Sequence, residues 1–368
     1  MSELADAVRV HGPAYIAKYS ASMLPSHRRA LDDILACRTP DMGGHIYECD
    51  CCGHVHYACH SCKNRSCSKC HTDDTREWIE KRREQLIGVP YYHVIFTVPP
   101  FLHRVARSNQ TAFYSALLNC AARSLIKLCA DPRYLSGTTA VMAVLHTWSR
   151  TLEFHPHVHC LVPAVAVAED DCIVAGHDNF LVPTGALMKI MRAMMLDELK
   201  RTIPGFVADH RARHSYWHLY IKPAVQGSER ILEYLGRYVH RIAISNNRIL
   251  SVTDEHVTLR YQDSRTLEWK TLTLTGEEFL RRFLQHVLPR GFHKVRYYGL
   301  WAPANRSVLR RARLLRPPDS DPPPAPDATP QPDTDVCTKT CPICRKGIMR
   351  FVSTFARVKD VSIPRGPP

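Results

Sequence analysis

The sequence predicts an α+β fold, a sheet with flanking helices, that carries a separate metal-binding module near its N-terminal end. Apolar β-branched segments alternate with helical segments through the middle of the 368-residue chain, and no glycine-rich phosphate loop connects a strand to a helix. Such a loop is typical of a doubly wound nucleotide-binding fold, which the sequence therefore disfavours. Eight of the 15 cysteines lie between Cys37 and Cys70. Cysteines clustered in this way indicate a small module that folds around metal.

The order of the elements follows from the side-chain pattern and from the residues that interrupt it. Residues 91–98 (YYHVIFTV) are aromatic and β-branched and are followed by Pro99, which predicts a strand. Residues 109–130 are rich in Ala and Leu at helical spacing and stop at Asp131-Pro132, which predicts a helix. By the same criteria we expect further strands at 140–148, 157–162, 217–222, 257–261 and 269–274, and further helices at 185–202, 229–244 and 277–287.

Composition limits the class of protein. The 49 Lys+Arg against 35 Asp+Glu give a net charge of +14, which favours nucleic acid as a partner. The apolar run from Cys160 to Ala168 is far shorter than the ~20 residues of a membrane-spanning helix. The N-terminus shows no basic-then-apolar signal segment. We therefore expect a cytoplasmic protein without a membrane partner, whose reduced cysteines bind metal rather than form disulfides.

Two C-x-x-C pairs in the cysteine-rich segment predict structural Zn²⁺. A two-residue spacing directs both thiolates of a pair to one tetrahedral ion. Two further cysteines flank these pairs, and the sequence leaves open how the ligands divide between one and two ions. The predicted zinc ligands are Cys37, Cys49, Cys52, Cys62, Cys67 and Cys70.

The remaining cysteines are of three kinds. Cys51 and Cys59 are the weakest zinc candidates of the cysteine-rich segment. Near the other end of the chain, three cysteines resemble half of a zinc knuckle that has no fourth local ligand. This possible second zinc site comprises Cys337, Cys341 and Cys344. Four isolated cysteines are expected to be small buried core residues, and these are Cys120, Cys129, Cys160 and Cys172.

Three histidines within seven residues, EFHPHVH at 153–159, form the most distinctive motif of the chain. Residues two apart on a strand point to the same face, so His157 and His159 are expected side by side, with Val158 on the opposite face. Two imidazoles at this spacing can chelate one divalent cation and leave positions for a phosphate oxygen. The alternative is a structural histidine pair without metal.

The predicted helix at 229–244 carries a second chemical pattern. Tyr234 and Tyr238 are four residues apart and lie on one ridge, and Arg237 and Arg241 lie on the next. Hydroxyls flanked by guanidinium groups suit attack on a phosphodiester, because Arg binds phosphate oxygens in pairs. The alternative is that both rings widen the apolar face. Gly236 in mid-helix costs roughly 1 kcal/mol relative to Ala, which indicates a close approach there. The stripe expected to face the core comprises Ile231, Leu235, Val239 and Ile242.

In this order, the histidine pair and the two-tyrosine helix resemble the HUH single-strand endonucleases. Together with these two features, further short motifs make the chain resemble rolling-circle insertion-sequence transposases of the IS91-like group. This resemblance runs from about residue 37 to about residue 299. It rests on CKNR at 62–65, LHTW at 145–148, HPH at 155–157, YLGRY at 234–238, AISN at 243–246 and GFH at 291–293.

The resemblance implies an HUH endonuclease-type antiparallel sheet flanked by helices, with an N-terminal zinc-binding module. It also implies that His157 and His159 hold catalytic Mg²⁺ or Mn²⁺, for which His146 is our candidate third ligand and His155 the next. A tyrosine then attacks the phosphate, which leaves a 5′-phosphotyrosine and a free 3′-hydroxyl.

The implied nucleophiles are Tyr234 and Tyr238, two of them so that two strand ends can be held at once. Arg237 and Arg241 are the implied phosphate contacts, and the implied partner is single-stranded DNA at the element ends and the target. A bacterial protein of this kind is expected at the nucleoid when it acts. Oligomeric state is left open. A DNA track is further expected at Arg281, Arg282, Arg290, Lys294, Arg296, Arg310, Arg311, Arg313 and Arg316.

Domain boundaries follow from the motifs and from a change in composition. Pro317 to Pro332 contains 8 prolines in 16 residues, which predicts an extended spacer. The expected units are a zinc-binding module at 1–89, an HUH two-tyrosine nuclease domain at 90–246, a basic α+β extension at 247–316, a Pro-rich linker at 317–336 and a Cys-bearing tail at 337–368.

The sequence is also compatible with two rival functions. A plasmid replication initiator or a conjugative relaxase uses similar HUH chemistry, and the fold alone does not separate them from a transposase. In a different class, the chain is a non-catalytic zinc-dependent DNA-binding protein whose histidines and tyrosines are structural.

Overall fold

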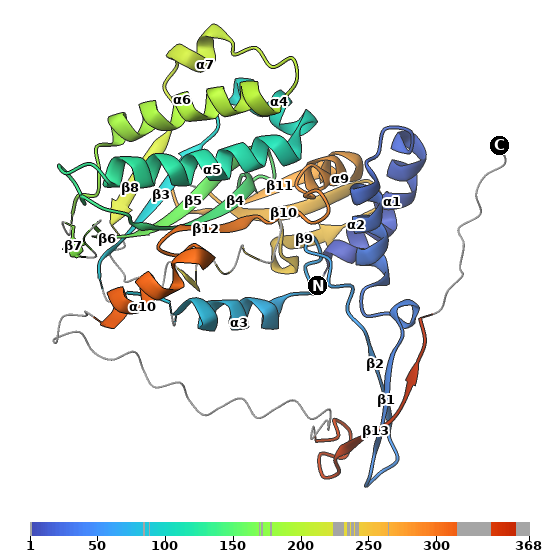
Figure 1. Cartoon of the computed structure of the whole chain (residues 1–368). Coiled ribbons are helices and arrows are strands. Elements are labelled where there is room, and N and C mark those ends of the chain that lie inside the picture. Colours follow the sequence, from blue (N-terminus) through green and yellow to red (C-terminus); the bar gives the residue numbers. More distant parts are fainter. Residues whose placement is uncertain are drawn as a thin grey trace.

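The centre of the molecule is a five-stranded sheet in which every neighbouring pair of strands is antiparallel (Figure 1). The computed structural model describes residues 2–83, 85–87, 89–168, 170, 172–176, 179–223, 232–233, 236, 239, 243–263, 265–314 and 340–357. The strand order is β12-β4-β5-β3-β8. The strands are β3 (Tyr91–Thr97), β4 (Ala140–Trp148), β5 (Phe154–Pro163), β8 (Leu219–Pro223) and β12 (Val295–Gly299).

Helices α5 (Gln110–Cys129) and α6 (Thr184–Thr202) cover one face of this sheet (Figure 1). Val158, Cys160 and Val162 of β5 point to that face and are fully buried in the main core. Because side chains alternate along a strand, His155, His157 and His159 of β5 point to the opposite face. Of two short helices, α4 (His103–Ser108) lies beside one end of this layer and α7 (His210–His214) lies on the outer side of α6 (Figure 1).

The opposite face of the sheet has a smaller apolar cluster. It comprises Tyr91, Met142, Val144, Leu161 and Leu232, against which Trp78 of α3 packs. Helices α3 (Thr72–Arg83) and α10 (Arg306–Leu314) lie on this side, below the sheet in Figure 1. The two-stranded sheet of β6 (Val165–Val167) and β7 (Ile173–Ala175) continues from the end of β5.

A second antiparallel sheet, of order β11-β10-β9, packs with α9 and the N-terminal helices. The Thr275 hydroxyl begins α9 by accepting a hydrogen bond from the Glu278 amide at 3.3 Å, and Phe279 and Phe283 are fully buried beneath it. The elements are α1 (Leu4–Tyr19), α2 (Pro25–Ala36), β9 (Ile249–Val252), β10 (His256–Gln262), β11 (Trp269–Thr275) and α9 (Gly276–Leu284). Short 3-10 turns occur at Pro40–Met42, Pro100–Leu102, Asn246–Arg248 and Pro303–Asn305.

A third sheet is assembled from both ends of the chain. The hairpin of β1 (Gly44–Cys49) and β2 (Val55–Cys59) pairs through β1 with β13 (Met349–Phe355), in the order β13-β1-β2. Figure 1 shows this ribbon projecting away from the rest of the molecule. The tail strand is therefore part of the N-terminal module in space.

The α+β class with an antiparallel sheet and flanking helices is confirmed, and most predicted elements are present within a few residues of their expected ends. The strand expected at 157–162 begins earlier, at Phe154, because Pro156 is compatible with extended backbone and its carbonyl accepts the Val98 amide at 3.1 Å. The helix expected at 277–287 ends at Leu284, and beyond it the amides of His286 and Val287 bond only three residues back.

Several strands were not expected from the sequence, namely β1, β2, β6, β7, β9, β12 and β13. These strands are short or contribute to small sheets, so their side-chain patterns give weak signals. The Pro-rich spacer and most of the helix expected at 229–244 lie outside the described residues. In the described part of the chain, no helix combines the length and the apolar character that crossing a bilayer requires.

Candidate functional site

Three histidines from two adjacent strands converge on the face of the sheet opposite α5. His146 of β4 is the register partner of His157 of β5, and Val144, two residues before His146, is the partner of His159. Residues two apart on a strand share a face, so this register places all three imidazoles in one group. One ring nitrogen of each lies within 4.8 Å of those of the other two. The structure thus brings the predicted pair together with the candidate third ligand.

Burial keeps these imidazoles neutral. His146 and His159 are each 3% exposed, and His157 is only partly covered. Desolvation lowers the pKa of His157 to about 4 and places the pKa of His146 and of His159 well below the usual value of 6.5. The neighbouring imidazoles lower the pKa of His146 and His159 further. A neutral imidazole keeps a lone pair on one ring nitrogen, and this is the form that binds a metal ion.

In two of the three rings, those of His157 and His159, Nδ1 has a hydrogen-bond partner. Nδ1 of His157 donates to the carbonyl oxygen of His155 at 2.6 Å. Nδ1 of His159 lies 2.7 Å from Nε2 of His93, on β3. When His159 is the donor in this pair, its Nε2 keeps the lone pair. Hydrogen bonds of this kind decide which imidazole nitrogen is available to a metal ion.

His93 is a site residue that the sequence reasoning missed. It faces the site because the register of β3 with β5 pairs Ile95 with His159, two residues beyond His93 on the same face. Burial, with the Lys222 charge as a smaller cause, lowers the pKa of His93 to about 4. The available signal was a polar residue inside an otherwise apolar and aromatic strand, YYHVIFTV.

His155, the second candidate for third ligand, is not a member of the three-histidine group. Its ring centroid is 5.1 Å from that of His157 and 6.5 Å from that of His103. Burial lowers its pKa below the usual value, with the His218 charge as a smaller cause. Its main contribution to the group is the backbone carbonyl that orients His157.

The donor set of this group fits a divalent transition cation. Within the described residues it consists of imidazole nitrogens alone, which favour transition metals over Mg²⁺. Three ligands on one side leave coordination positions that a phosphate oxygen and water can occupy. Partial exposure of His157 is compatible with access for such a ligand.

The two predicted nucleophiles, Tyr234 and Tyr238, lie outside the described residues, as do Arg237 and Arg241. The described residues around them are helical. They are Leu232, Glu233, Gly236 and Val239.

These helical residues pack on the histidine-bearing side of the sheet. Leu232 is 1% exposed and lies in the apolar cluster with Val144, the register partner of His159. A Cβ added at Gly236 would lie 2.7 Å from both Cγ1 and Cδ1 of Ile79 in α3, so the expected close approach at this glycine is present. Val239 of the predicted core stripe is 6% exposed.

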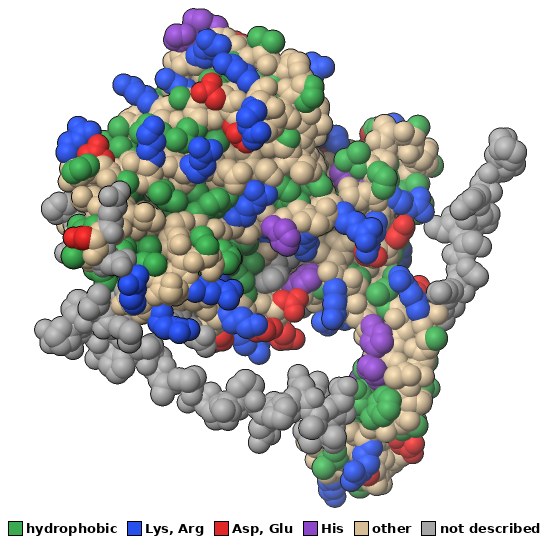
Figure 2. Space-filling model, in the orientation of Figure 1, with side chains coloured by type: hydrophobic (Ala, Val, Ile, Leu, Met, Phe, Trp, Pro, Cys, Tyr) green, Lys and Arg blue, Asp and Glu red, His purple; other side chains and the backbone are tan. Residues whose placement is uncertain are grey.

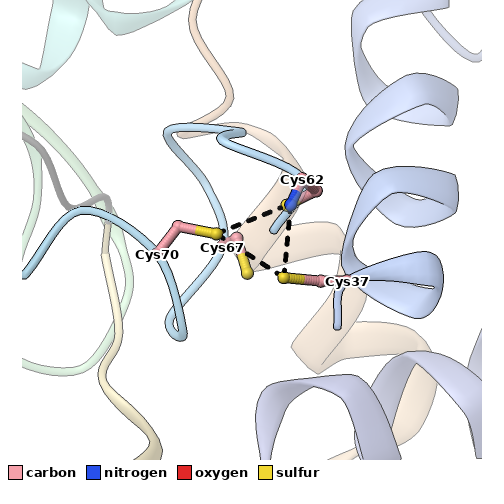
Figure 3. Close-up of side chains that lie close together, drawn as sticks. All are labelled: Cys37, Cys62, Cys67 and Cys70. Carbon is pink, nitrogen blue, oxygen red and sulfur yellow. Dashed lines mark hydrogen bonds between the residues drawn. The ribbon is translucent and has the colours of Figure 1, made fainter. Parts of the chain in front are cut away.

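One group of four cysteines stands at the end of α2 (Figure 3). Cys37 follows the last residue of α2, and the other three come from the loop that precedes α3. The Sγ of Cys70 lies 3.5 Å from that of Cys37 and 3.7 Å from that of Cys62. Hydrogen bonds from neighbouring thiols lower the pKa of Cys67 to about 5, which favours its thiolate. This group contains four of the six predicted zinc ligands.

The other two predicted ligands, Cys49 and Cys52, form a second group with Cys341 and Cys344 of the tail. The tail pair therefore obtains its missing partners from the N-terminal module. Cys337 lies outside the described residues. Cys51 and Cys59 belong to neither group.

Of the isolated cysteines, three are buried as expected, namely Cys120, Cys129 and Cys160. The expectation was wrong for Cys172, which is exposed in the short turn before β7.

Part of the expected DNA track is used inside the fold, whereas Arg290 is exposed. Arg296 donates to the side chains of Asn119 at 3.2 Å and Ser115 at 2.9 Å, and Lys294 is 3% exposed. Arg281 and Arg282 both pair with Glu278. Figure 2 shows Lys and Arg side chains spread over the visible face, with acidic side chains beside those on α3. Of the cluster after residue 309, Arg310 and Arg311 are exposed, Arg313 has no described side chain, and Arg316 lies outside the described residues.

Two family models match the chain. One, described as "Putative transposase", matches residues 140–308 and includes His146, His157 and His159. The other, a transposase zinc-binding domain, matches residues 7–98 and includes the group formed by Cys37, Cys62, Cys67 and Cys70.

Similar proteins are also found among curated sequences and solved structures. "Putative transposase y4qJ" of Sinorhizobium fredii (strain NBRC 101917 / NGR234) is 35% identical over 395 residues, covering 100% of this chain and 97% of that protein. The transposase for insertion sequence element IS801 of Pseudomonas savastanoi pv. phaseolicola is 31% identical over 290 residues, covering 73% and 68%. The conjugative relaxase TrwC in complex with mutant OriT DNA matches 60% of this chain and 70% of that chain, with 11% identity and a TM-score of 0.26.

Proposed function

The chain belongs to the IS91-like family of insertion-sequence transposases, and from this premise we propose that it nicks and rejoins single-stranded DNA through 5′-phosphotyrosine intermediates during rolling-circle transposition. The observation that carries the proposal is the buried, neutral group of His146, His157 and His159. Removing three neighbouring imidazoles largely from water costs free energy, and binding one metal ion in common would offset that cost.

The catalytic cation in this proposal is Mn²⁺ or Mg²⁺, held by these three histidines, whose imidazole nitrogens favour Mn²⁺ of the two. When bound, a divalent cation withdraws electron density from the scissile phosphate and fixes its position. His93 holds the His159 ring through Nδ1, and the His155 carbonyl holds the His157 ring. The chain thereby keeps the ligand nitrogens oriented before DNA binds.

Tyr234 and Tyr238 are the proposed nucleophiles. The phenolic oxygen of one forms a bond to phosphorus while the bond from phosphorus to the 3′-oxygen breaks. The phenol gives up its proton, and the leaving 3′-oxygen takes up one proton to become a hydroxyl, so that the net change is transfer of one proton from the phenol to the 3′-oxygen. The covalent phosphotyrosine conserves the energy of the broken ester for rejoining. Support comes from Leu232 and Gly236, the helical residues around Tyr234, which pack on the histidine-bearing side of the sheet.

Two tyrosines allow two strand ends to be held at once, as transfer of a strand from donor to target requires. Arg237 and Arg241 are the proposed contacts to phosphate oxygens, since a guanidinium binds them in pairs. A single strand suits a largely buried site, because a flexible backbone can bend into it where a duplex cannot.

A covalent-adduct assay tests the proposal. Single-stranded oligonucleotides that span the termini of the encoding element are incubated with the protein and Mn²⁺, and protein–DNA adducts are resolved under denaturing conditions. The wild type is expected to form an adduct that Tyr234→Phe plus Tyr238→Phe abolishes. Tyr216→Phe, at an exposed tyrosine outside the site, is the matched control and keeps the adduct.

Three outcomes refute parts of the proposal. Absence of any adduct with the wild type favours the non-catalytic DNA-binding alternative. Persistence of the adduct in the double tyrosine variant means that another residue is the nucleophile. An adduct that forms on plasmid origins of replication or transfer but not on the element termini favours a replication initiator or relaxase.

A further inference from the structure

The ribbon at the far end of the molecule contains two loops that face each other. The first, Cys49-Asp50-Cys51-Cys52-Gly53, connects β1 to β2. The second, Cys341-Pro342-Ile343-Cys344, precedes β13, and a bridge between Thr340 and Ile348 closes it. Each loop contains one C-x-x-C pair. Antiparallel pairing of β13 with β1, which places Met349 opposite Cys49, brings the two loops together.

The sulfur atoms of the two pairs are spaced as zinc requires. Sγ of Cys49 lies 3.6 Å from Sγ of Cys344, and Sγ of Cys52 lies 3.8 Å from Sγ of Cys341. Four thiolates at Zn–S bonds of about 2.3 Å in a tetrahedron are about 3.8 Å apart. Both contacts join residues from opposite ends of the chain, and all four sulfur atoms lie within 4.8 Å of one another.

Backbone amides around these thiols are placed to stabilise thiolates. The Cys51 amide donates to Sγ of Cys49 at 3.4 Å, and the Gly347 amide donates to Sγ of Cys344 at 3.4 Å. Each loop therefore directs one backbone amide at a cysteine sulfur.

Contacts other than those between sulfur atoms also join the two loops. Asp50 accepts the Ile348 amide on its side chain at 2.8 Å, donates its own amide to the Ile348 carbonyl at 3.2 Å, and pairs with Arg350 at 3.1 Å. A Cβ on Gly347 would lie 2.5 Å from both Sγ of Cys49 and Cβ of Cys51. Only glycine allows the tail loop to approach this closely.

The ribbon has little else to hold it. The apolar cluster around it contains three buried residues, Cys49, Cys341 and Met349, and two of these are thiols. Most of β13 is exposed, with Phe351 at 50% and Val352 at 53%. A ribbon of this size without a hydrophobic core normally needs a metal ion or a disulfide.

We propose that Cys49, Cys52, Cys341 and Cys344 form a structural zinc site that joins the two ends of the chain. The site is separate from the group formed by Cys37, Cys62, Cys67 and Cys70, and half of it lies far beyond residues 7–98, where the zinc-binding family model matches. Zinc here holds β13 on β1, so the tail is a component of the N-terminal module.

Zinc content of the full-length purified protein tests this site, with no need for nicking activity. One zinc per cysteine group gives two per chain for the wild type. Cys341→Ser plus Cys344→Ser is expected to lose one, and so is Cys49→Ser plus Cys52→Ser. Combining all four substitutions is expected to lose no further zinc, because both pairs hold the same ion. Cys51→Ser plus Cys59→Ser, which changes two cysteines outside both groups, is the matched control and keeps the wild-type content.

Alkylation with iodoacetamide followed by mass spectrometry reads out the same site by residue and detects misfolding. In Cys341→Ser plus Cys344→Ser, Cys49 and Cys52 are expected to become reactive, while Cys37 and Cys70 stay protected. Loss of protection at all four of these cysteines indicates global unfolding of the double serine variant. Cys341→His alone, which keeps a zinc ligand at this position, is then expected to keep both the zinc content and the protection of the wild type.

Three results would overturn the proposal. The first is retention of both zinc ions when Cys341 and Cys344 are replaced. The second is a further loss of zinc when the four substitutions are combined. The third is a non-reduced intact mass lower by the hydrogens of disulfide formation, which would show that the four thiols are oxidised rather than metal-bound.

Discussion

Replacing His93 with alanine tests how the histidine site is oriented. The substitution removes the partner of Nδ1 of His159, 2.7 Å away, and leaves that buried nitrogen without this hydrogen bond. An unsatisfied buried donor costs about 1–3 kcal/mol. Since 1.4 kcal/mol is a factor of ten, this corresponds to a roughly 5- to 150-fold loss in metal affinity. Loss of a hydrogen bond to a metal-binding histidine typically costs about 10- to 100-fold, which agrees with this range.

The assay is adduct formation with single-stranded DNA as a function of Mn²⁺ concentration. His93→Ala is expected to raise the half-saturating Mn²⁺ concentration by about 10- to 100-fold, with much of the adduct yield restored at saturating metal. In His93→Gln, the side-chain oxygen can accept from Nδ1 of His159, so the loss should be smaller. His155→Ala is the matched control, because it lies on the same strand as His157 and keeps the carbonyl that orients His157.

Two results would refute this reasoning. One is an unchanged Mn²⁺ dependence in His93→Ala while His159→Ala abolishes the adduct, which would mean that His93 does not orient the ligand. The other is a larger shift in His155→Ala than in His146→Ala, which would reverse the choice of third ligand.

The remaining predictions concern stability. His286 is fully buried, and desolvation lowers its pKa to about 4. As pH falls from 6.5 towards 4, only the unfolded state therefore takes up a proton on this side chain. Between pH 7.5 and 5, the unfolding free energy measured in urea should fall by about 2 kcal/mol more for the wild type than for His286→Gln. Burial lowers the pKa of Lys294 to about 7, so above pH 7 the unfolded state binds more protons than the folded state. The unfolding free energy of the wild type should therefore rise by about 2 kcal/mol from pH 7 to 9, and Lys294→Met should lack this rise. Gly236→Ala should lower the unfolding free energy by about 1–3 kcal/mol and reduce adduct yield, because the new Cβ would meet the Ile79 side chain. Adding Ile79→Ala should restore both quantities. Unchanged stability in Gly236→Ala alone would contradict the close packing.

Local patterns were sufficient wherever the chemistry lies on one continuous segment. Alternation along a strand predicted that His157 and His159 share a face, and they do. The two-residue spacing of Cys67 and Cys70 predicted a pair of ligands, and both belong to one group. These inferences need only the repeat of a strand or the geometry of a short loop, and neither depends on the rest of the fold.

The choice among candidates separated by many residues was different. The sequence motifs favour His146 over His155 as third ligand, but what brings His146 to the pair is the register of β4 on β5. His93 was missed altogether, because its place beside His159 depends on the register of β3 on β5 across 66 residues of sequence. A shift of that register by one residue would turn its side chain to the other face.

The sequence by itself determined which residue types share one short segment: a histidine pair on a strand, cysteine pairs at C-x-x-C spacing, and two tyrosines four residues apart. Only the tertiary structure decided which of these parts belong together. Cys49 and Cys344 are separated by 295 residues, yet their sulfur atoms lie 3.6 Å apart. The physical reason is that ligand spacing is a local property of the backbone, whereas pairing between distant segments depends on strand register and buried contacts formed by the whole chain.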